Sequence, residues 1–245
     1  MKVTAWKGGT YGIRVGKANA HKFFKKEWEN IEVEINGVFY KFKLSPTFWM
    51  TCPEFRGKSI SAWLLSHKLI SWPKGKPPIL ELVPIGGNRF RLTEPYIYFA
   101  YGSNMDINRM ISRKISFSAF ETAVLNDYKL IFNKKASKKE GIGYANIKKS
   151  KNIKVIGVVY TLAEDFSKLD IYEGHPTHYI RIKVKINKRI GNETVIATTY
   201  IANPKKIIDG LKPEKNYLQH LINGASQHSF PQDYIKYLKC VETRY

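Results

Sequence analysis

The segment Tyr101-Gly102-Ser103-Asn104 follows a strand-like run, Tyr96 to Ala100, and has the composition of a tight turn that opens a helix. Gly relieves backbone crowding, while Ser and Asn favour turns and cap a following helix. Successive backbone N–H groups in such a turn form a cradle for a carboxylate or a phosphate. An ordinary strand-to-helix turn uses the same residue types, so both interpretations stay open.

A second candidate for chemistry is Glu173, near the end of the helix-like run Leu169-Asp170-Ile171-Tyr172-Glu173-Gly174. Gly174 suits a helix C-terminus, where the macrodipole disfavours a negative charge. Residues placed against local preference tend to mark functional sites. Glu173 is therefore a candidate acid or base, although an exposed glutamate at a frayed helix end would give the same pattern.

A third segment, Gly141 to Ile147, is rich in Gly and leads toward a strand, so its backbone can pass close to a ligand. A flexible loop after the Lys-rich run Lys134–Lys139 would have the same composition. A second Lys-rich run, Lys148–Lys154, follows it. The two runs either favour a large or anionic substrate or are solvated loops.

Metal and redox chemistry find little support in the sequence. Cys52 and Cys240 are the only cysteines, and no CxxC or Cys/His cluster is present. In an intracellular chain two buried free thiols are commoner than a disulfide. The closest histidines, His175 and His178, lack further ligands nearby. We expect no metal and no cofactor.

The elements that must position these residues are of mixed type. Val155–Leu162 is mostly apolar, as in a strand buried on both faces, and Tyr179–Ile186 alternates apolar and polar residues like a half-buried strand. Leu162–Ile171 and Asn216–Asn223 are interpreted as helices. This irregular alternation predicts an α+β fold with a small mixed β-barrel and flanking helices, not a doubly wound sheet.

The preceding segment, residues 1–94, is predicted to be a separate β-rich domain, because a turn-type cluster at Leu92–Pro95 separates it from the rest. Asn36-Gly37 between alternating runs is the strongest local hairpin signal. Gly86-Gly87 predicts a second hairpin. Two helices are expected in this segment, over Ala18–Trp28 and Ser59–Lys68.

Net charge is +21, from 41 basic and 20 acidic side chains among 245 residues. The excess favours a polyanionic partner such as nucleic acid, or it reflects a Lys-rich solvated surface; both explanations stay open. No apolar run approaches the ~20 residues of a membrane span, and Met1–Thr10 lacks the apolar core of a signal peptide. We expect a soluble, cytoplasmic protein with no membrane partner.

Several motifs occur in an order and spacing that carry a family resemblance. They are Tyr101–Met105 (Tyr-Gly-Ser-Asn-Met), Gly143–Ile147, Gly157–Tyr160, Leu169–Gly174 and a tail over Tyr217–Ala225 followed by Phe230-Pro231. Each motif is weak alone. The ordered set, over about 95–245, resembles the γ-glutamylcyclotransferase family, which includes the AIG2-like proteins.

The resemblance implies a catalytic domain over residues 95–245, built as a small mixed β-barrel that uses no cofactor. It implies release of 5-oxoproline from a γ-glutamyl amine or peptide, in which the substrate's α-amine attacks its own γ-carbonyl. Glu173 would be the general acid/base. The implied substrate-binding residues are Tyr101, Gly102, Ser103, Asn104, Met105 and Tyr217.

Residues 1–94 are expected to form a basic accessory domain. The pattern resembles B3-like DNA-binding pseudobarrels, and a β-rich protein-binding module is the other interpretation. For the whole chain, the alternative to an enzyme is a nucleic-acid-binding protein that uses the cyclotransferase scaffold to bind a ligand without turnover. The candidate nucleic-acid contacts are Arg14, Lys17, Lys22, Trp72, Lys74 and Lys76.

Overall fold

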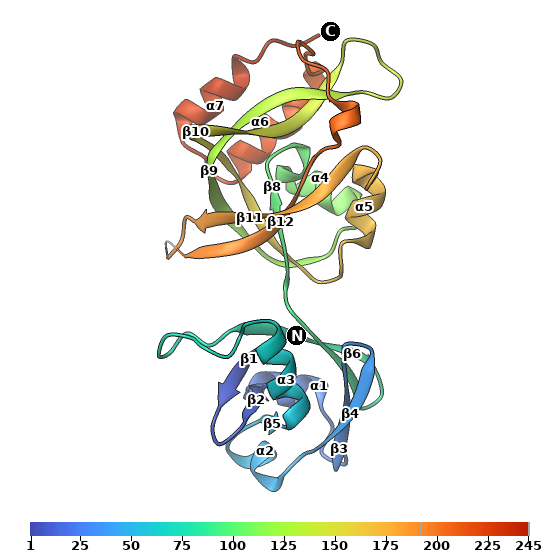
Figure 1. The fold of residues 1–245 in the computed structure, drawn as a ribbon, viewed down its shortest axis with the longest axis vertical. Helices are drawn as coiled ribbons and strands as arrows, with labels where there is room; N and C mark the ends of the chain where they lie inside the picture. Colours follow the sequence, from blue (N-terminus) through green and yellow to red (C-terminus); the bar gives the residue numbers. More distant parts are fainter. Residues whose placement is uncertain (192, 245) are drawn as a thin grey trace. The chain divides into compact units, whose positions relative to one another are not determined.

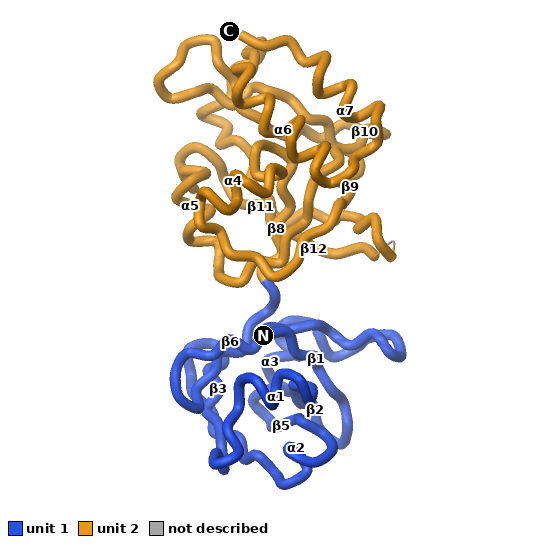
Figure 2. The backbone as a smooth tube through the Cα atoms, turned by 180° about the vertical axis from the view of Figure 1, so that it is seen from behind, with its two compact units in different colours: residues 1–95 blue, residues 96–245 orange. Residues whose placement is uncertain are grey.

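The structure, a computed structural model, describes residues 1–191 and 193–244. The chain divides into two compact units, residues 1–95 and residues 96–245 (Figure 2). Each unit has its own hydrophobic core, since the two clusters of buried side chains share no residue. A separate core is the mark of a structural domain.

Unit 1, all of whose residues are described, is built on a seven-stranded sheet with the strand order β4-β3-β7-β6-β1-β2-β5 (Figure 1). The rings of Phe42 on β4 and Phe55 on β5 lie 5.1 Å apart, so the two edge strands approach each other and the sheet curls. Its elements are β1 (Lys2–Lys7), β2 (Tyr11–Arg14), α1 (Lys17–Phe23), β3 (Asn30–Ile35), β4 (Val38–Lys43), α2 (Pro46–Met50), β5 (Glu54–Arg56), α3 (Lys58–Ser66), β6 (Ile79–Gly86) and β7 (Arg89–Thr93).

Both hairpins predicted for unit 1 are confirmed. Asn36 and Gly37 have φ values of 52° and 81°, as a type I′ turn requires, and they join the antiparallel strands β3 and β4. Gly86 and Gly87 turn the chain between β6 and β7 with φ values of 119° and 56°. Local turn chemistry therefore sets the register of these strand pairs.

The helices of unit 1 are shorter than the sequence predicts. The helix expected over Ala18–Trp28 is α1, which ends where Phe24 takes an extended backbone with ψ 151° and enters the core. The helix expected over Ser59–Lys68 is α3, which ends before Lys68, whose φ of 58° is left-handed. Core packing ends the first helix and backbone conformation ends the second.

Among its described residues, unit 2 forms a closed β-barrel with the strand order β10-β8-β12-β11-β9, flanked by helices (Figure 1). Strands β8 and β12 are parallel and the other neighbours antiparallel, so the predicted α+β class with a small mixed barrel is confirmed. The elements are β8 (Tyr96–Ala100), η1 (Ser103–Met105), α4 (Ile107–Ser112), β9 (Phe117–Lys135), β10 (Gly143–Leu162), α5 (Ser167–Glu173), β11 (Tyr179–Lys188), β12 (Thr194–Ala202), η2 (Pro204–Lys206), α6 (Lys215–Gln227) and α7 (Gln232–Lys239).

Two features of unit 2 differ from the sequence-based expectations. The Lys-rich run Lys148–Lys154 is not a loop but a bulged part of β10, which pairs with β9. The helix expected over Leu162–Ile171 begins only at Ser167, because Leu162 still pairs with Phe117 on β9. Pairing between distant segments decides both cases, and strand propensity alone does not predict it.

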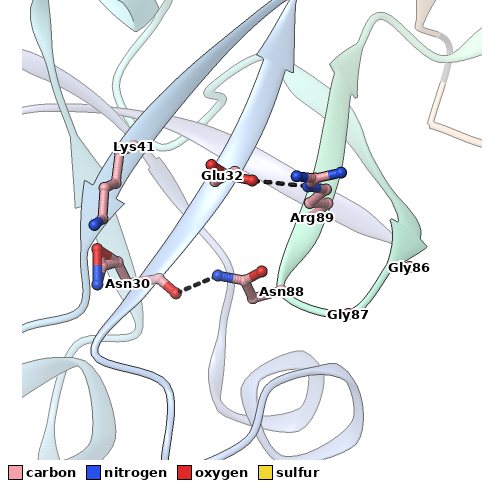
Figure 3. A pocket seen from close by; sticks show the side chains of 7 residues that line it. All are labelled: Asn30, Glu32, Lys41, Gly86, Gly87, Asn88 and Arg89. Atoms are coloured by element: carbon pink, nitrogen blue, oxygen red, sulfur yellow. Dashed lines mark hydrogen bonds and ion pairs between the residues drawn. The ribbon is translucent and has the colours of Figure 1, made fainter.

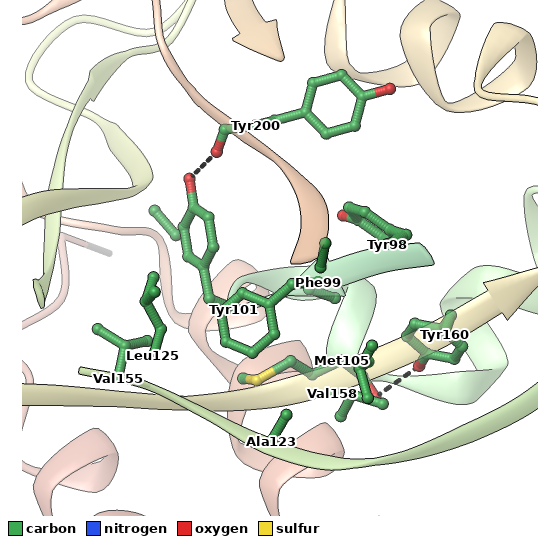
Figure 4. Close-up of a cluster of buried hydrophobic side chains, with 14 of the residues drawn as sticks. Tyr98, Phe99, Tyr101, Met105, Ala123, Leu125, Val155, Val158, Tyr160 and Tyr200 are labelled. Atoms are coloured by element: carbon green, nitrogen blue, oxygen red, sulfur yellow. Dashed lines mark hydrogen bonds between the residues drawn. The ribbon is translucent and has the colours of Figure 1, made fainter. Parts of the chain in front are cut away.

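The core of the barrel supports the turn that follows β8. Phe99 and Met105 are fully buried. The hydroxyl of Tyr160 on β10 donates to the backbone carbonyl of Met105 at 3.4 Å (Figure 4) and to that of Asn104 at 3.0 Å. The turn is thereby fixed to β10, the strand that pairs with β8, and a binding site on a loop needs such support.

Candidate active site

The turn after β8 is also held by the helices around it. Gly224 of α6 lies so close that a Cβ there would stand 2.6 Å from Met105 and 2.7 Å from the backbone nitrogen of Asp106. Asp106 caps α4 by accepting from the backbone N–H of Asn108 at 3.0 Å. The first N–H groups of a helix have no acceptor within it. In η1 these leading N–H groups are those of Ser103 and Asn104, and the segment from Gly102 to Asn104 lines a pocket.

Glu173 faces this turn across the pocket. It is the last residue of α5, and Gly174 follows in the left-handed conformation with φ 60°, as the sequence predicts. Oε1 of Glu173 accepts from Nδ2 of Asn104 at 3.0 Å and from Nη1 of Arg113 at 3.4 Å. The side chain is 17% exposed, so the alternative of an exposed glutamate at a frayed helix end is wrong.

The surroundings of Glu173 adjust its acidity. Burial raises the pKa of Glu173 above its usual value, and the guanidinium of Arg113 and the amide of Asn104 oppose the rise. Arg113 also donates to Oδ1 of Asn104 at 2.6 Å, which directs Nδ2 of that amide to Glu173. A carboxyl group with a raised pKa is suited to accept and return a proton near neutral pH.

Tyrosine side chains form much of the remaining pocket wall. The hydroxyl of Tyr217 on α6 accepts from the backbone N–H of Ala145 at 3.1 Å, and that of Tyr179 on β11 donates to the carbonyl of Ala145 at 2.8 Å. Burial raises the pKa of Tyr217 to about 12, so this hydroxyl stays neutral. The pocket is lined by Tyr98, Tyr101, Gly102, Ser103, Asn104, Ala145, Glu173, Tyr179, Tyr200 and Tyr217.

Most of the residues predicted to bind substrate reach this pocket. Tyr101, Gly102, Ser103, Asn104 and Tyr217 line it together with Glu173. Met105 does not line it: its side chain is fully buried, and its carbonyl accepts from Nε2 of His228 at 3.0 Å. Met105 therefore supports the turn from the core. Among the lining residues, the hydroxyl of Tyr101 donates to the carbonyl of Tyr200 on β12 (Figure 4).

Several residues that the sequence motifs did not indicate line this pocket or influence the acidity of Glu173. Arg113 contacts Glu173, and the buried Nε of Arg109 on α4 has no hydrogen-bond partner in the part of the chain that the structure describes. The two arginines are four residues apart directly after the turn, a spacing that places them on one helix face and that was the available signal. Tyr98, Tyr179 and Tyr200 come from three strands, β8, β11 and β12, and no spacing connects them.

In the part of the chain that the structure describes, neither a group of metal-binding side chains nor a membrane-spanning helix is found. Among residues 1–191 and 193–244, no three His, Cys, Asp or Glu side chains are grouped so that they could hold a metal ion. Cys52 and Cys240 are free and exposed, so the expectation of buried thiols is wrong. In the same part of the chain, no helix combines the length and apolar character needed to cross a lipid bilayer.

An open hollow of about 460 Å³ lies in unit 1 beside the turn between β6 and β7 (Figure 3). Its carboxylate, Glu32, accepts from Nε of Arg89 at 2.7 Å, and the side chain of Asn88 donates to the carbonyl of Asn30 at 3.0 Å. These polar groups satisfy one another, and no buried acid or base converges on the space. The narrower pocket at Glu173 is therefore the candidate active site.

The residues predicted to contact nucleic acid lie on β2, on α1 and in the segment between α3 and β6 of unit 1. Arg14 on β2 is ion-paired with Glu54 at 3.2 Å. Trp72 is half-buried, with its ring 6.0 Å from that of Tyr11. The remaining four are exposed lysines: Lys17, Lys22, Lys74 and Lys76. Nucleic-acid binding by unit 1 stays a prediction that rests on net charge.

Comparison with known proteins connects this pocket to a family. A sequence model of the AIG2-like family matches residues 154–238, the stretch that holds Glu173 and Tyr217. The γ-glutamylcyclotransferase of Mus musculus is 32% identical over 154 residues, which cover 61% of this chain and 80% of the relative. The chain belongs to the γ-glutamylcyclotransferase family. It is an enzyme of the γ-glutamylcyclotransferase type, as the sequence motifs predict.

Further relatives agree with this membership of the γ-glutamylcyclotransferase family. The γ-glutamylcyclotransferase of Homo sapiens is 30% identical over the same shares of the two chains. A solved γ-glutamyl cyclotransferase structure superposes with a TM-score of 0.54 at 28% identity, over 62% of this chain and 90% of the other. YkqA from Bacillus subtilis, at 15% identity, matches 99% of this chain and 88% of its own with a TM-score of 0.52. That last likeness concerns the fold alone, and it extends over both units.

Proposed function

We propose that this enzyme releases 5-oxoproline from a γ-glutamyl amine or peptide, with Glu173 as general acid/base. The observation that carries the proposal is the hydrogen bond between Asn104 and Glu173. It places a carboxyl group of raised pKa opposite a turn whose leading N–H groups have no acceptor within their own helix. A pocket lined by both elements lies between them.

In the proposed reaction, the α-amine of the substrate attacks the carbonyl carbon of its own γ-amide. A carbon–nitrogen bond forms and closes a five-membered ring, and the bond to the departing amine breaks. The α-amine is largely protonated at neutral pH, so it must lose a proton before it attacks. Because both reacting groups belong to one molecule, holding the substrate folded lowers the barrier by several kcal/mol.

Glu173 takes the proton from the attacking amine and returns it to the departing nitrogen. One carboxyl group can perform both steps when its pKa lies closer to neutrality than that of an ordinary glutamate. Burial supplies the rise in the pKa, and Arg113 with Asn104 limits it, so that the ionised form remains accessible.

Two further groups complete the proposed binding mode. Negative charge that develops on the γ-carbonyl oxygen needs hydrogen-bond donors, and the leading backbone N–H groups of η1, at Ser103 and Asn104, are suited to that role. The α-carboxylate of the substrate is attached to the same carbon as the α-amine, which transfers its proton to Glu173. The proposed partner of this carboxylate is Arg109, whose Nε has no hydrogen-bond partner among the described residues.

The substitution Glu173→Gln tests this function. It keeps the size of the side chain and removes its proton chemistry, so we expect 5-oxoproline release to fall about 100-fold or more, with an unchanged melting temperature. The assay uses a panel of γ-glutamyl amines and peptides.

A matched control is Glu164→Gln. Glu164 is half exposed and ion-paired with Lys168 at 2.8 Å, outside the pocket, so this variant should release 5-oxoproline at the wild-type rate. If Glu173→Gln also kept most of the wild-type rate, Glu173 would not be the acid/base.

A further inference from the structure

Strand β4 of unit 1 has a partner strand along only one of its two edges. It stands first in the strand order of its sheet, and among the described residues only β3 pairs with it. The two-residue turn Asn36-Gly37 makes Ile35 and Val38 a hydrogen-bonded pair, and such pairs recur at every second residue. The bond from the N–H of Leu44 to the carbonyl of Glu29, at 2.8 Å, follows the same alternation.

The backbone groups of the intervening residues of β4 point away from β3. These residues are Phe39, Lys41 and Lys43. In the part of the chain that the structure describes, their N–H and carbonyl groups form no hydrogen bond with the backbone of another segment. A row of free N–H and carbonyl groups along a sheet edge is a template for one more strand.

Apolar side chains of β4 are exposed beside this free edge. Val38 is 52% exposed, Phe39 46% and Tyr40 39%. Residues directly opposite each other in an antiparallel pair share one face of the sheet. Val38 and Tyr40 lie opposite buried residues of β3, so they belong to the core-facing side. The apolar face of the sheet therefore continues past the core at this edge.

An open hollow of about 560 Å³ follows the same edge and carries positive charge. The carboxylates on neighbouring strands are already engaged, since Glu32 is paired with Arg89 and Glu54 with Arg14. The cations that line the hollow are all exposed, and none forms an ion pair with a described residue; they are Lys41, Lys43, Arg56 and Lys58.

The free edge, the apolar face and the charge together select one class of occupant. The free carbonyl groups need hydrogen-bond donors, which peptide N–H groups supply and the phosphates of a nucleic acid do not. A second copy of β4 would bring lysines close to lysines, and like charges across a strand pair are destabilising. An extended peptide with acidic and apolar side chains satisfies all three features.

We propose that the free edge of β4 binds an acidic segment of a partner protein as an added antiparallel strand. Every second residue of that segment is acidic and lies opposite Lys41 or Lys43, and the residues between them are apolar and lie opposite Tyr40 and Phe42. In strand addition, backbone hydrogen bonds supply affinity and alternate side chains supply specificity. This inference concerns unit 1 and does not depend on the reaction proposed for unit 2.

The test is a calorimetric titration of the full chain with a synthetic hexapeptide, which matches the length of β4. The probe is Glu-Val-Glu-Val-Glu-Val, blocked at both ends, in about 0.15 M salt. It should bind about tenfold or more tightly than the peptide Lys-Val-Lys-Val-Lys-Val, because only the acidic peptide complements the lysines. Absence of binding, or equal binding of both peptides, would overturn the inference.

Two N-methylated forms of the acidic peptide test strand pairing itself. In the proposed register the glutamates form hydrogen-bonded pairs with Lys41 and Lys43, so methyl groups on the glutamate nitrogens remove the donors and should weaken binding about tenfold or more. Methyl groups on the valine nitrogens point away from β4 and should leave the affinity nearly unchanged. Equal affinities of the two forms would contradict strand addition. This comparison uses the wild-type chain, so it does not depend on the folding of a variant.

The double variant Lys41→Glu/Lys43→Glu tests the charge of the edge. It should lose about tenfold or more in affinity for the acidic peptide and gain affinity for the basic one. The control Lys74→Glu/Lys76→Glu makes the same change in net charge at exposed positions outside the hollow. It should bind the acidic peptide like the wild type, since salt screens distant charges. Equal losses in the two double variants would leave only a general attraction and would refute the site.

Oligothymidylate is the competing probe, because a nucleic-acid strand is the other polyanion that the charge of unit 1 could attract. We expect it to bind the full chain more weakly than the acidic hexapeptide does. Tighter binding of oligothymidylate that is lost in Lys41→Glu/Lys43→Glu, and kept in the control variant, would assign the edge to nucleic acid and overturn the inference.

Discussion

The side-chain amide of Asn104 donates from Nδ2 to Oε1 of Glu173 at 3.0 Å. This bond joins the turn after the first barrel strand to the end of α5, 69 residues later in the chain. Arg113 holds the other end of the same amide at 2.6 Å. The orientation of Asn104 and the acidity of Glu173 are therefore linked, and substitutions at either end of the network should change both.

Arg113→Gln should shift the acid limb of the kcat/KM profile to higher pH. A general base acts as a carboxylate, so activity falls as the pH drops through the pKa of Glu173. Burial raises that pKa and Arg113 opposes the rise. Without the guanidinium the pKa rises further, and we expect the limb to move up by about one pH unit. The measurement is a pH profile of 5-oxoproline release.

Lys168→Gln is the control for that profile. It removes one positive charge from the same helix as Glu173, at a side chain that is 47% exposed, where solvent screens the effect. Its acid limb should coincide with that of the wild type. An unmoved limb in Arg113→Gln would argue against Glu173 as the base.

Tyr217→Phe should lower both turnover and stability. The backbone N–H of Ala145 loses its acceptor at the pocket wall, and an unsatisfied buried donor costs about 1–3 kcal/mol. We expect a roughly tenfold drop in kcat/KM. Tyr237→Phe makes the same change at an exposed ring on α7, and it should behave like the wild type in the same assay.

Gly224→Ala should displace the turn that holds the pocket. The added Cβ would lie 2.6 Å from Met105 and 2.7 Å from the nitrogen of Asp106, so α6 and η1 must separate. Overpacking of this kind costs about 1–3 kcal/mol, measurable by urea unfolding, and kcat should fall with it. Asn223→Ala, at the exposed preceding position of the helix, should keep both values near those of the wild type.

Asp106→Asn should make the free energy of unfolding of unit 2 depend less on pH in the acidic range. Hydrogen bonds from His220, Gln227 and Asn108 outweigh burial and lower the pKa of Asp106. In the unfolded chain the pKa of an aspartate is about 3.9. Because the pKa of Asp106 is lower in the folded protein, its ionised carboxylate stabilises the folded state at a pH above that value. This contribution is lost as the pH falls through the pKa of Asp106 in the folded protein. The free energy of unfolding should drop by about 1 kcal/mol at neutral pH.

Unfolding at acidic pH completes that measurement. There the wild type has lost the contribution of ionised Asp106, so the two proteins should converge in stability. Asn retains the ability to cap α4, which limits the loss to the charge. A constant difference between wild type and variant at all pH values would show that Asp106 contributes no pH-dependent stability.

Short-range features of this protein follow from its sequence. The Asn36-Gly37 hairpin forms because two adjacent residues tolerate positive φ, and Gly174 ends α5 for the same reason. The ordered motifs from Tyr101 onward predicted the family and the residues of one pocket wall. In each case the physical cause lies within a few residues, so a sequence pattern can carry it.

Tertiary structure decided the features that depend on distant partners. Lys134 belongs to a run that looks solvated, yet pairing of β9 with β10 buries it beside Tyr144 and Tyr179. The acidity of Glu173 depends on Arg113, which is 60 residues away along the chain. Burial and the electric field of neighbouring charges are properties of the packed chain, and local composition does not contain them.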